Sequence, residues 1–268
     1  MNGLKTNNSP HWSVVVPHFV FGAICFFLLA ILIVLADTSL LAEYFNPKII
    51  AITHMAVLGW ATMIVFGALY QLIPVVFETS LYSEKLAKIT FVVTSFSVLF
   101  LTYSFWVGAF LDLLRYASAC MFASLLLFIL NIVLTYRKAT LKNIKSTFII
   151  TAIFWLAFTE VLGTLVAFNF SYNFFPEIHF HYLKIHATFG LIGWFLLLII
   201  GVGSTLIPMF LISHELNEKK IMKSYYFINV GLIGLLLNWF LIKIEIISSV
   251  AFLLIVVGVL FFISFIQF

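Results

Sequence analysis

Residues Thr53 to Pro74 read THMAVLGWATMIVFGALYQLIP, and residues His186 to Pro208 read HATFGLIGWFLLLIIGVGSTLIP. Between the two stretches, Gly-Trp, a following glycine and Leu-Ile-Pro recur 134 residues apart, which is half of the 268 residues. A repeat at a fixed spacing identifies the building unit of a fold. We therefore predict a single membrane domain, residues 1–268, with internal repeats at 1–134 and 135–268.

Composition indicates that the chain lies in a membrane. Hydrophobic residues make up 64% of it and charged residues 9%, which is more apolar surface than a soluble domain can bury. A helix needs roughly 20 apolar residues to cross a bilayer, whereas barrel strands would be about 10 residues long with alternating polarity. Eight runs of helical length are present, at 14–36, 49–77, 86–110, 112–135, 147–170, 181–212, 223–243 and 246–268. We predict an all-α polytopic membrane protein with eight transmembrane helices.

The offset of 134 residues places the first four spans on the last four. Because four is even, both modules enter the membrane from the same side, which predicts two tandem parallel four-helix repeats. Ten of the fourteen cations fall at the N-terminus or in loops on that same side: Lys5, Lys85, Lys88, Arg137, Lys138, Lys142, Lys145, Lys219, Lys220 and Lys223. The positive-inside rule then places both termini in the cytoplasm. The basic pI near 9.0 therefore indicates topology and contact with the lipid bilayer, and no nucleic-acid partner is expected.

Two histidines are the leading candidates for chemistry. His54 lies about five residues into the second span and His186 about five into the sixth, so we expect similar depths, roughly 7 Å below the helix starts. Ionisable groups inside a membrane mark functional sites by default, and neutral imidazole is a ligand for heme iron and for copper. The strict repeat, however, aligns His186 with Ile52. The alternative is that each histidine is a polar residue near the interface, hydrogen-bonded to a carbonyl or to water.

Charged residues within the spans give further candidates. Glu160 falls near the middle of the fifth span, where an ionised carboxylate costs about 2.5–3.5 kcal/mol. We interpret it as a proton-relay or ion-site carboxyl, with a structural hydrogen bond as the alternative. Asp112 and Arg115 are one turn apart, which favours a local ion pair. Arg115 is also suited to the propionates of a cofactor.

Other histidines favour structural interpretations. His18 lies at the inner start of the first span, which is typical of a side chain that snorkels to the interface. The run Glu177-Ile-His-Phe-His just outside the sixth span could bind a divalent metal, but we interpret it as an ordinary interfacial loop. Trp60 and Trp194 are expected to pack between the modules.

The two quoted runs resemble segments of the heme-copper oxidase subunit I superfamily, in particular C-type cytochrome oxidases, nitric oxide reductases and NnrS-type heme membrane proteins. In that family a histidine near the outer face of helix 2 ligates the low-spin heme, and helix 6 carries a copper ligand. The resemblance implies that His54 and His186 hold heme iron or copper, with heme b as the expected cofactor and copper possible. It also implies that the heme is lined by residues of the same runs and by one arginine: Gly59, Trp60, Gly193, Trp194 and Arg115.

The chain departs from the family pattern in two places. The span at 223–243 lacks the histidine pair of the family's helix 7, and the third arc of four helices is absent, so the binuclear oxygen-reducing site cannot be assembled from these residues. The simplest remaining site is one b-type heme held by His54 and His186, or by one of them with an open sixth position.

Three functional classes follow from the sequence. The first is a heme protein of the bacterial inner membrane for electron transfer or for handling O2 or NO; if it is an enzyme, it is an oxidoreductase related to cytochrome or nitric oxide oxidoreductases. The second is an accessory protein that handles heme or copper during respiratory oxidase assembly. The third is a proton-coupled transporter with Glu160 as the coupling carboxyl. Respiratory oxidase subunits or a second copy of the chain are the expected protein partners.

Overall fold

The computed structural model describes residues 8–36, 40, 46–139, 142–211 and 217–266, so Lys5 lies outside the described residues. Within these ranges the chain is helical throughout and contains no strand. The first four spans are α1 (Trp12–Leu35), a composite of α2 (Pro47–His54), η3 (Met55–Thr62) and α3 (Met63–Val76), α4 (Glu84–Trp106) and α5 (Leu113–Lys138). The last four are α6 (Ile144–Tyr172), a composite of α7 (His179–Thr188), η4 (Phe189–Leu196) and α8 (Leu197–Phe210), a composite of α9 (Glu218–Leu237) and η5 (Asn238–Ile242), and α10 (Glu245–Ile266).

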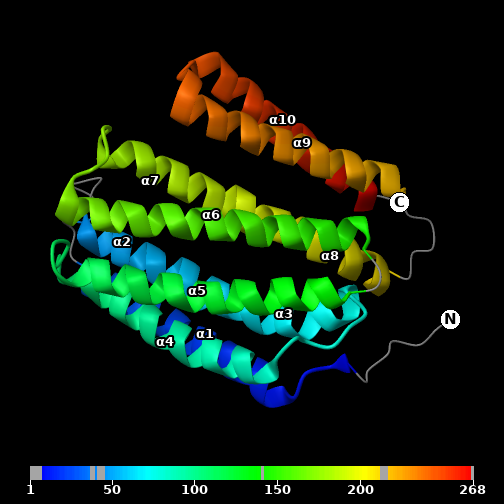
Figure 1. Ribbon diagram of the computed structural model, residues 1–268, viewed down its shortest axis with the longest axis horizontal. Coiled ribbons are helices and arrows are strands. Elements are labelled where there is room, and N and C mark those ends of the chain that lie inside the picture. The colour runs from blue at the N-terminus through cyan, green and yellow to red at the C-terminus, as the bar shows by residue number, and fades with distance from the viewer. Residues whose placement is uncertain (1–7, 37–39, 41–45, 140–141, 212–216, 267–268) are drawn as a thin grey trace. The chain divides into compact units, whose positions relative to one another are not determined.

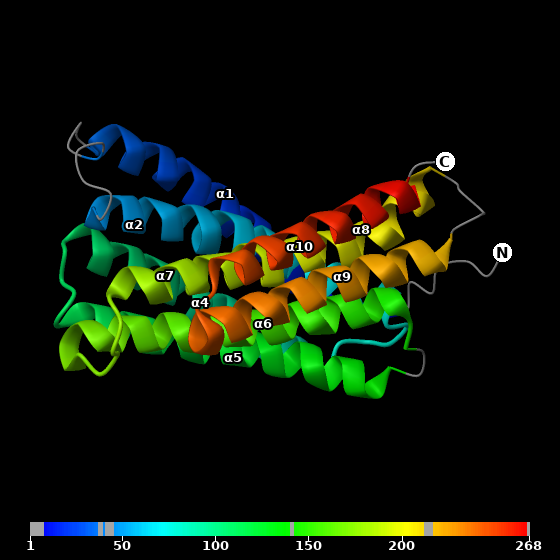
Figure 2. The ribbon, with the colours of Figure 1, turned by 90° about the horizontal axis from the view of Figure 1, so that it is seen from above.

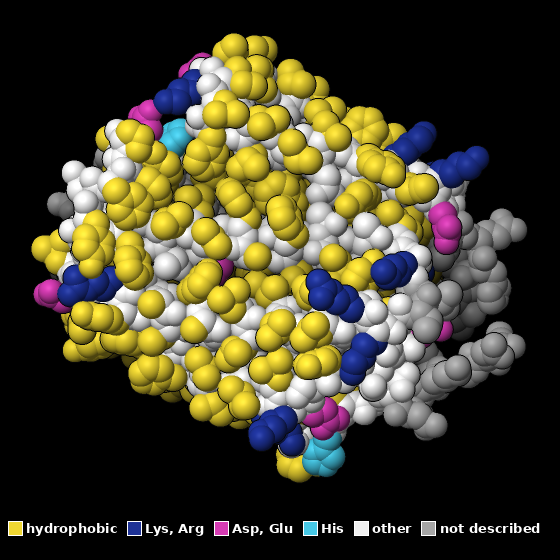
Figure 3. Space-filling view, in the orientation of Figure 1, with side chains coloured by type: hydrophobic (Ala, Val, Ile, Leu, Met, Phe, Trp, Pro, Cys, Tyr) yellow, Lys and Arg dark blue, Asp and Glu magenta, His cyan; other side chains and the backbone are white. Residues whose placement is uncertain are grey.

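All eight helical spans are long and apolar enough to cross a membrane. On the face drawn in Figure 3, hydrophobic side chains cover the middle of the helices, and Lys and Arg lie toward the helix ends. Large apolar side chains point outward, such as Phe27 at 67% exposure and Leu253 at 61%. The all-α fold class and the eight spans are thus confirmed, and they suggest an integral membrane protein in a lipid bilayer.

Polar residues set the starts of several spans. Asn46 accepts a hydrogen bond from the Lys48 amide, and Pro47 occupies the first turn of α2. Ser83 caps α4 through the Leu86 amide, and Asn217 caps α9. Such caps satisfy amides that have no partner inside the helix. The helices therefore begin two to five residues before the apolar runs at these places.

The chain forms two compact units. One comprises Met1–Leu141 and Gly163–Pro176, and the other comprises Lys142–Leu162 and Glu177–Phe268. Helix α6 contributes its first part to the second unit and its last part to the first. The sites below are described within one unit at a time.

In the first unit, α1 packs closely on η3 and α3 (Figure 1). A Cβ placed on Gly59 would lie 3.1 Å from Cys25 Sγ, and one on Gly67 would lie 3.1 Å from His18 Cβ. Glycine is needed at both positions because any side chain would push α1 away. On α3 and α5 the rings of Phe66 and Phe128 stack in the core.

In the second unit, the same two kinds of glycine bring α6 against η4 and α8. A Cβ on Gly193 would lie 2.8 Å from Trp155, and one on Gly201 would lie 2.8 Å from Phe148. Helices α9 and α10 run side by side in both views (Figures 1 and 2). Their contact is also close, since a Cβ on Gly231 would meet the Ala251 carbonyl at 2.6 Å.

The second and sixth spans are not continuous α-helices as the sequence predicted. Each contains a π-helical segment of eight residues, Met55–Thr62 in one and Phe189–Leu196 in the other. The two segments begin 134 residues apart and both contain the Gly-Trp pair. π-Helical turns are rare and occur frequently at functional sites. Apolar periodicity does not reveal them, because they change the hydrogen-bond register without changing composition.

Candidate histidine sites

His54 is the last residue of α2 and directly precedes η3. Its Nδ1 donates to the carbonyl of Ile50, one turn earlier, at 2.8 Å. The ring stacks on Phe105 of α4, with centroids 4.8 Å apart and planes inclined by 28°. The imidazole, which is half-buried, is therefore held by its own helix on one edge and by an aromatic ring on one face.

His186 lies two residues before the end of α7 and is held by a different helix. Its Nδ1 donates to the carbonyl of Thr159 in α6 at 3.0 Å. The neighbouring Gly190 makes this approach possible, because a Cβ there would lie 3.2 Å from the Thr159 methyl carbon. Thr159 directly precedes Glu160, so α6 carries both the group that orients His186 and the carboxyl in mid-helix.

These two hydrogen bonds fix the tautomer of both imidazoles. A proton on Nδ1 that is donated to a carbonyl leaves Nε2 as the nitrogen with the lone pair. Histidines that ligate metals nearly always donate their other ring N–H in this way. The carbonyl hydrogen bond expected from the structural interpretation is thus present, and it is also the orientation that an iron ligand requires. Each histidine belongs to a different unit.

The Gly-Trp pairs occupy unequal environments. Trp60 is 42% exposed and lies against Phe26 of its own unit at 4.9 Å between ring centroids. Trp194 is 2% exposed. The prediction that Trp60 packs between the modules is therefore wrong, because the π-helical turn directs this ring to the exterior of the helix pair.

Arg115 interacts with its neighbour in sequence. It donates to the hydroxyl of Tyr116 at 3.3 Å, and its guanidinium lies 4.9 Å from the ring centroid. No ion pair with Asp112 occurs within 4 Å in the described structure, so the predicted hairpin ion pair is wrong. Asp112 precedes α5 and stands outside its helical turn, which removes the one-turn geometry that the spacing implied.

His18 is completely buried, at 0% exposure, so its interpretation as a snorkelling interface residue is wrong. Nδ1 donates to the Val14 carbonyl at 2.7 Å, and the ring contacts Tyr70 and Phe91 edge-on. Nε2 finds no hydrogen-bond partner among the described residues. The close approach of α1 to Gly67 carries this ring inside the unit, which sequence position alone did not reveal.

Acidic and sulfur ligands do not gather around the histidines. Among the described residues no three or more His, Cys, Asp or Glu side chains form a group that could hold a metal ion. In the loop before α7, His181 Nε2 donates to the Trp239 carbonyl at 3.1 Å, and Glu177 pairs with Lys243 at 2.6 Å. The ion pair lowers the pKa of Glu177 and raises that of Lys243. These contacts support the interfacial-loop interpretation.

Comparisons with protein-family models, with curated proteins and with solved structures found no match to this chain. The argument for function therefore depends on the residues, their geometry and the resemblance of the two quoted runs. What the geometry offers is two neutral imidazoles, each oriented through Nδ1 and each close to a π-helical turn.

Proposed function

We propose that this chain is a b-type heme-binding integral membrane protein that resembles heme-copper oxidase subunit I and serves electron transfer or O2 or NO handling without a complete binuclear centre. One observation carries the proposal. Both candidate histidines donate Nδ1–H to a backbone carbonyl, at 2.8 Å for His54 and 3.0 Å for His186, which presents Nε2 as the ligand nitrogen.

The residues of each unit fit a heme ligand role. His54 is held in place by Ile50 and Phe105, so little side-chain freedom would be lost on ligation. His186 is held by Thr159. Arg115 is half-buried, and its planar fork suits a propionate. A bound heme would supply one-electron chemistry, or gas binding if one axial position stays open.

The proposal includes the arrangement in the membrane. We infer two tandem parallel four-helix repeats with both termini in the cytoplasm, in the inner membrane of a bacterium. The equal spacing of the two π-helical segments and the matched glycine contacts of α1 and α6 support the repeat. The excess of cations in the inner loops supports the orientation. Respiratory oxidase subunits or a second copy of this chain are the partners we propose.

A reduced-minus-oxidised visible spectrum with a pyridine hemochromogen assay tests the heme proposal. The detergent-purified wild type is compared with His54→Ala, His186→Ala and the control His11→Ala, whose histidine precedes α1 and contacts Ser13. We expect a b-type spectrum with about one heme per chain in wild type and control, and loss of it in at least one of the other two variants. A folded, colourless wild type without iron or copper would refute the proposal.

A proton-coupled transporter is the second candidate. Glu160 lies at the middle of the 29-residue helix α6, beside the carbonyl that anchors His186. A carboxyl at that depth is costly unless it exchanges protons or is paired. Proton flux into proteoliposomes that is abolished by Glu160→Gln in heme-free protein would decide for transport. A heme spectrum that is lost during purification would instead favour the assembly or accessory class.

A further inference from the structure

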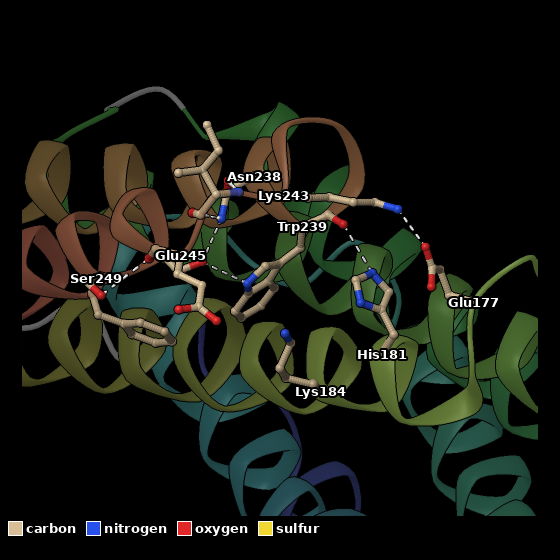
Figure 4. Close-up of a pocket in the computed structure, with 11 residues that line it drawn as sticks. Glu177, His181, Lys184, Asn238, Trp239, Lys243, Glu245 and Ser249 are labelled. Carbon is tan, nitrogen blue, oxygen red and sulfur yellow. Dashed lines mark hydrogen bonds and ion pairs between the residues drawn. The ribbon is translucent and has the colours of Figure 1, made fainter.

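The second unit contains a cavity of about 550 Å³ that is open on one side (Figure 4). It lies where three spans end or begin: the first turns of α7, the end of η5 and the start of α10. Its lining includes two carboxylates, two ammonium groups and two aromatic rings, from Glu177, Glu245, Lys184, Lys243, Trp239 and Phe252. None of these residues takes part in the proposed heme ligation.

One wall of the cavity is a turn locked by a buried amide. Asn238 is 2% exposed, and its side chain accepts from the Ile244 amide at 2.9 Å and donates to the Ile244 carbonyl at 2.9 Å and to Ser248 Oγ at 2.7 Å. Trp239 Nε1 also donates to Ser248 Oγ, at 3.0 Å. Within this turn Lys243 adopts a left-handed conformation with φ of 60°, which a residue with a side chain rarely takes. The wall is therefore pre-organised.

The charges inside the cavity are arranged in two sets. Glu177 and Lys243 form an ion pair at 2.6 Å on one side. Lys184 instead places its ammonium 4.6 Å from the Trp239 ring centroid, and neither Lys184 nor Glu245 is in an ion pair with a described residue. Figure 4 shows the Lys184 ammonium and the Glu245 carboxylate both projecting into the space beside Trp239. One cation and one anion thus remain to meet a ligand.

This balance favours a zwitterionic ligand. The two carboxylates and two ammonium groups sum to zero charge, so a ligand with a single charge would leave one of Lys184 and Glu245 without a counter-charge. A ligand with an anionic and a cationic group would satisfy both. A primary ammonium has three N–H donors for a carboxylate, whereas a quaternary ammonium has none.

The surroundings of the cavity indicate a lipid rather than a soluble ligand. Exposed apolar side chains border it on η5 and α10, including Leu241 at 75%, Ile246 at 67% and Leu253 at 61% exposure. Tryptophan and lysine at the ends of spans are typical of the headgroup level of a membrane. Acyl chains can follow the apolar flank of α10 while the headgroup enters the cavity.

We propose that this cavity binds the phosphoethanolamine headgroup of a membrane phospholipid. The phosphate meets the ammonium of Lys184, and the primary ammonium of the lipid meets the carboxylate of Glu245. Trp239 supplies the floor on which Lys184 rests, and the Asn238 turn keeps that floor in place.

Native mass spectrometry of the delipidated, detergent-purified chain tests this assignment. Phosphatidylethanolamine, phosphatidylcholine and phosphatidylglycerol with identical acyl chains are titrated against wild type, Lys184→Met and Glu245→Gln. Lys48→Met is the matched control, because Lys48 also places its ammonium over a tryptophan, 5.4 Å from the Trp106 ring centroid, but in the other unit. Thermal melting establishes that each variant is folded.

We expect the wild type and Lys48→Met to bind phosphatidylethanolamine most tightly. Loss of one charge-assisted hydrogen bond should raise its apparent Kd about tenfold in Lys184→Met. Glu245→Gln, which preserves shape and lies on an exposed residue, should erase the preference over phosphatidylcholine. Equal wild-type binding of these two lipids, or pocket variants that bind like Lys48→Met, would overturn the proposal. Displacement of the lipid by equimolar soluble phosphoethanolamine would overturn the lipid as the source.

Discussion

Removal of the Asn238 amide should destabilise the second unit through a single turn. Asn238→Ala deletes three side-chain hydrogen bonds, two with the Ile244 backbone and one with Ser248. Each contributes about 0.5–1.5 kcal/mol net. Water can replace part of this, because Ile244 is 48% exposed, so we take the low to middle part of the sum and expect a loss of about 2–3 kcal/mol.

Thermal unfolding in detergent, followed by tryptophan fluorescence, measures this loss. A change of that size corresponds to a fall in Tm of about 5–10 °C for a chain of this length. Asn217→Ala is the matched control, because Asn217 is exposed and its side chain makes one cap hydrogen bond, with the Lys219 amide at 3.1 Å. If Asn238→Ala melts no lower than Asn217→Ala, the side chain does not hold the turn and the reasoning is refuted.

Two further predictions follow from packing and from charge. Gly193→Ala should lower stability by about 1–3 kcal/mol, because the new methyl would lie 2.8 Å from Trp155, whereas Gly203→Ala, which meets only a ring tip at 3.3 Å, should melt close to wild type; equal melting of the two would contradict this. The ion pair lowers the pKa of Glu177 from 4.5, so its stabilisation is fully present above pH 4.5 and disappears as the pH falls through the lowered value; the Tm difference between wild type and Glu177→Gln should be constant at neutral pH and shrink in acid. Lys243, whose pKa is raised from 10.5, limits the effect at the alkaline end in the opposite sense; a difference that grows in acid would refute the assignment.

Composition and run length predicted the spans because lipid leaves helices few alternatives. A backbone in hydrocarbon must satisfy its own hydrogen bonds, so apolar runs of sufficient length become helices almost regardless of detail. The sixth span illustrates this, expected at 181–212 and found at His179–Phe210. The seventh began earlier than its apolar run, at Glu218, because Asn217 caps the helix on a charged first turn.

Features that depend on contacts between distant residues were not predicted. His18 is buried because Gly67, about fifty residues away in sequence, lets α1 approach α3. The lipid cavity draws Lys184 and Glu245 from separate spans, and each looks like an ordinary interfacial charge by itself. The chemical role of His54 was indicated by its type and depth, but its tautomer follows only from the Ile50 contact.

The two histidine sites share a backbone plan but are not equivalent in how they are held. His54 is anchored to the carbonyl of its own helix, so its orientation moves with α2. His186 is anchored to Thr159 of α6, so its orientation depends on the contact between α6 and α7. Because Thr159 adjoins Glu160, a change in protonation of that carboxyl which shifted α6 would act on His186 and leave the hydrogen bond of His54 unchanged. A heme on His54 would therefore be the rigid site, and any coupling between a proton and a ligand would act through His186.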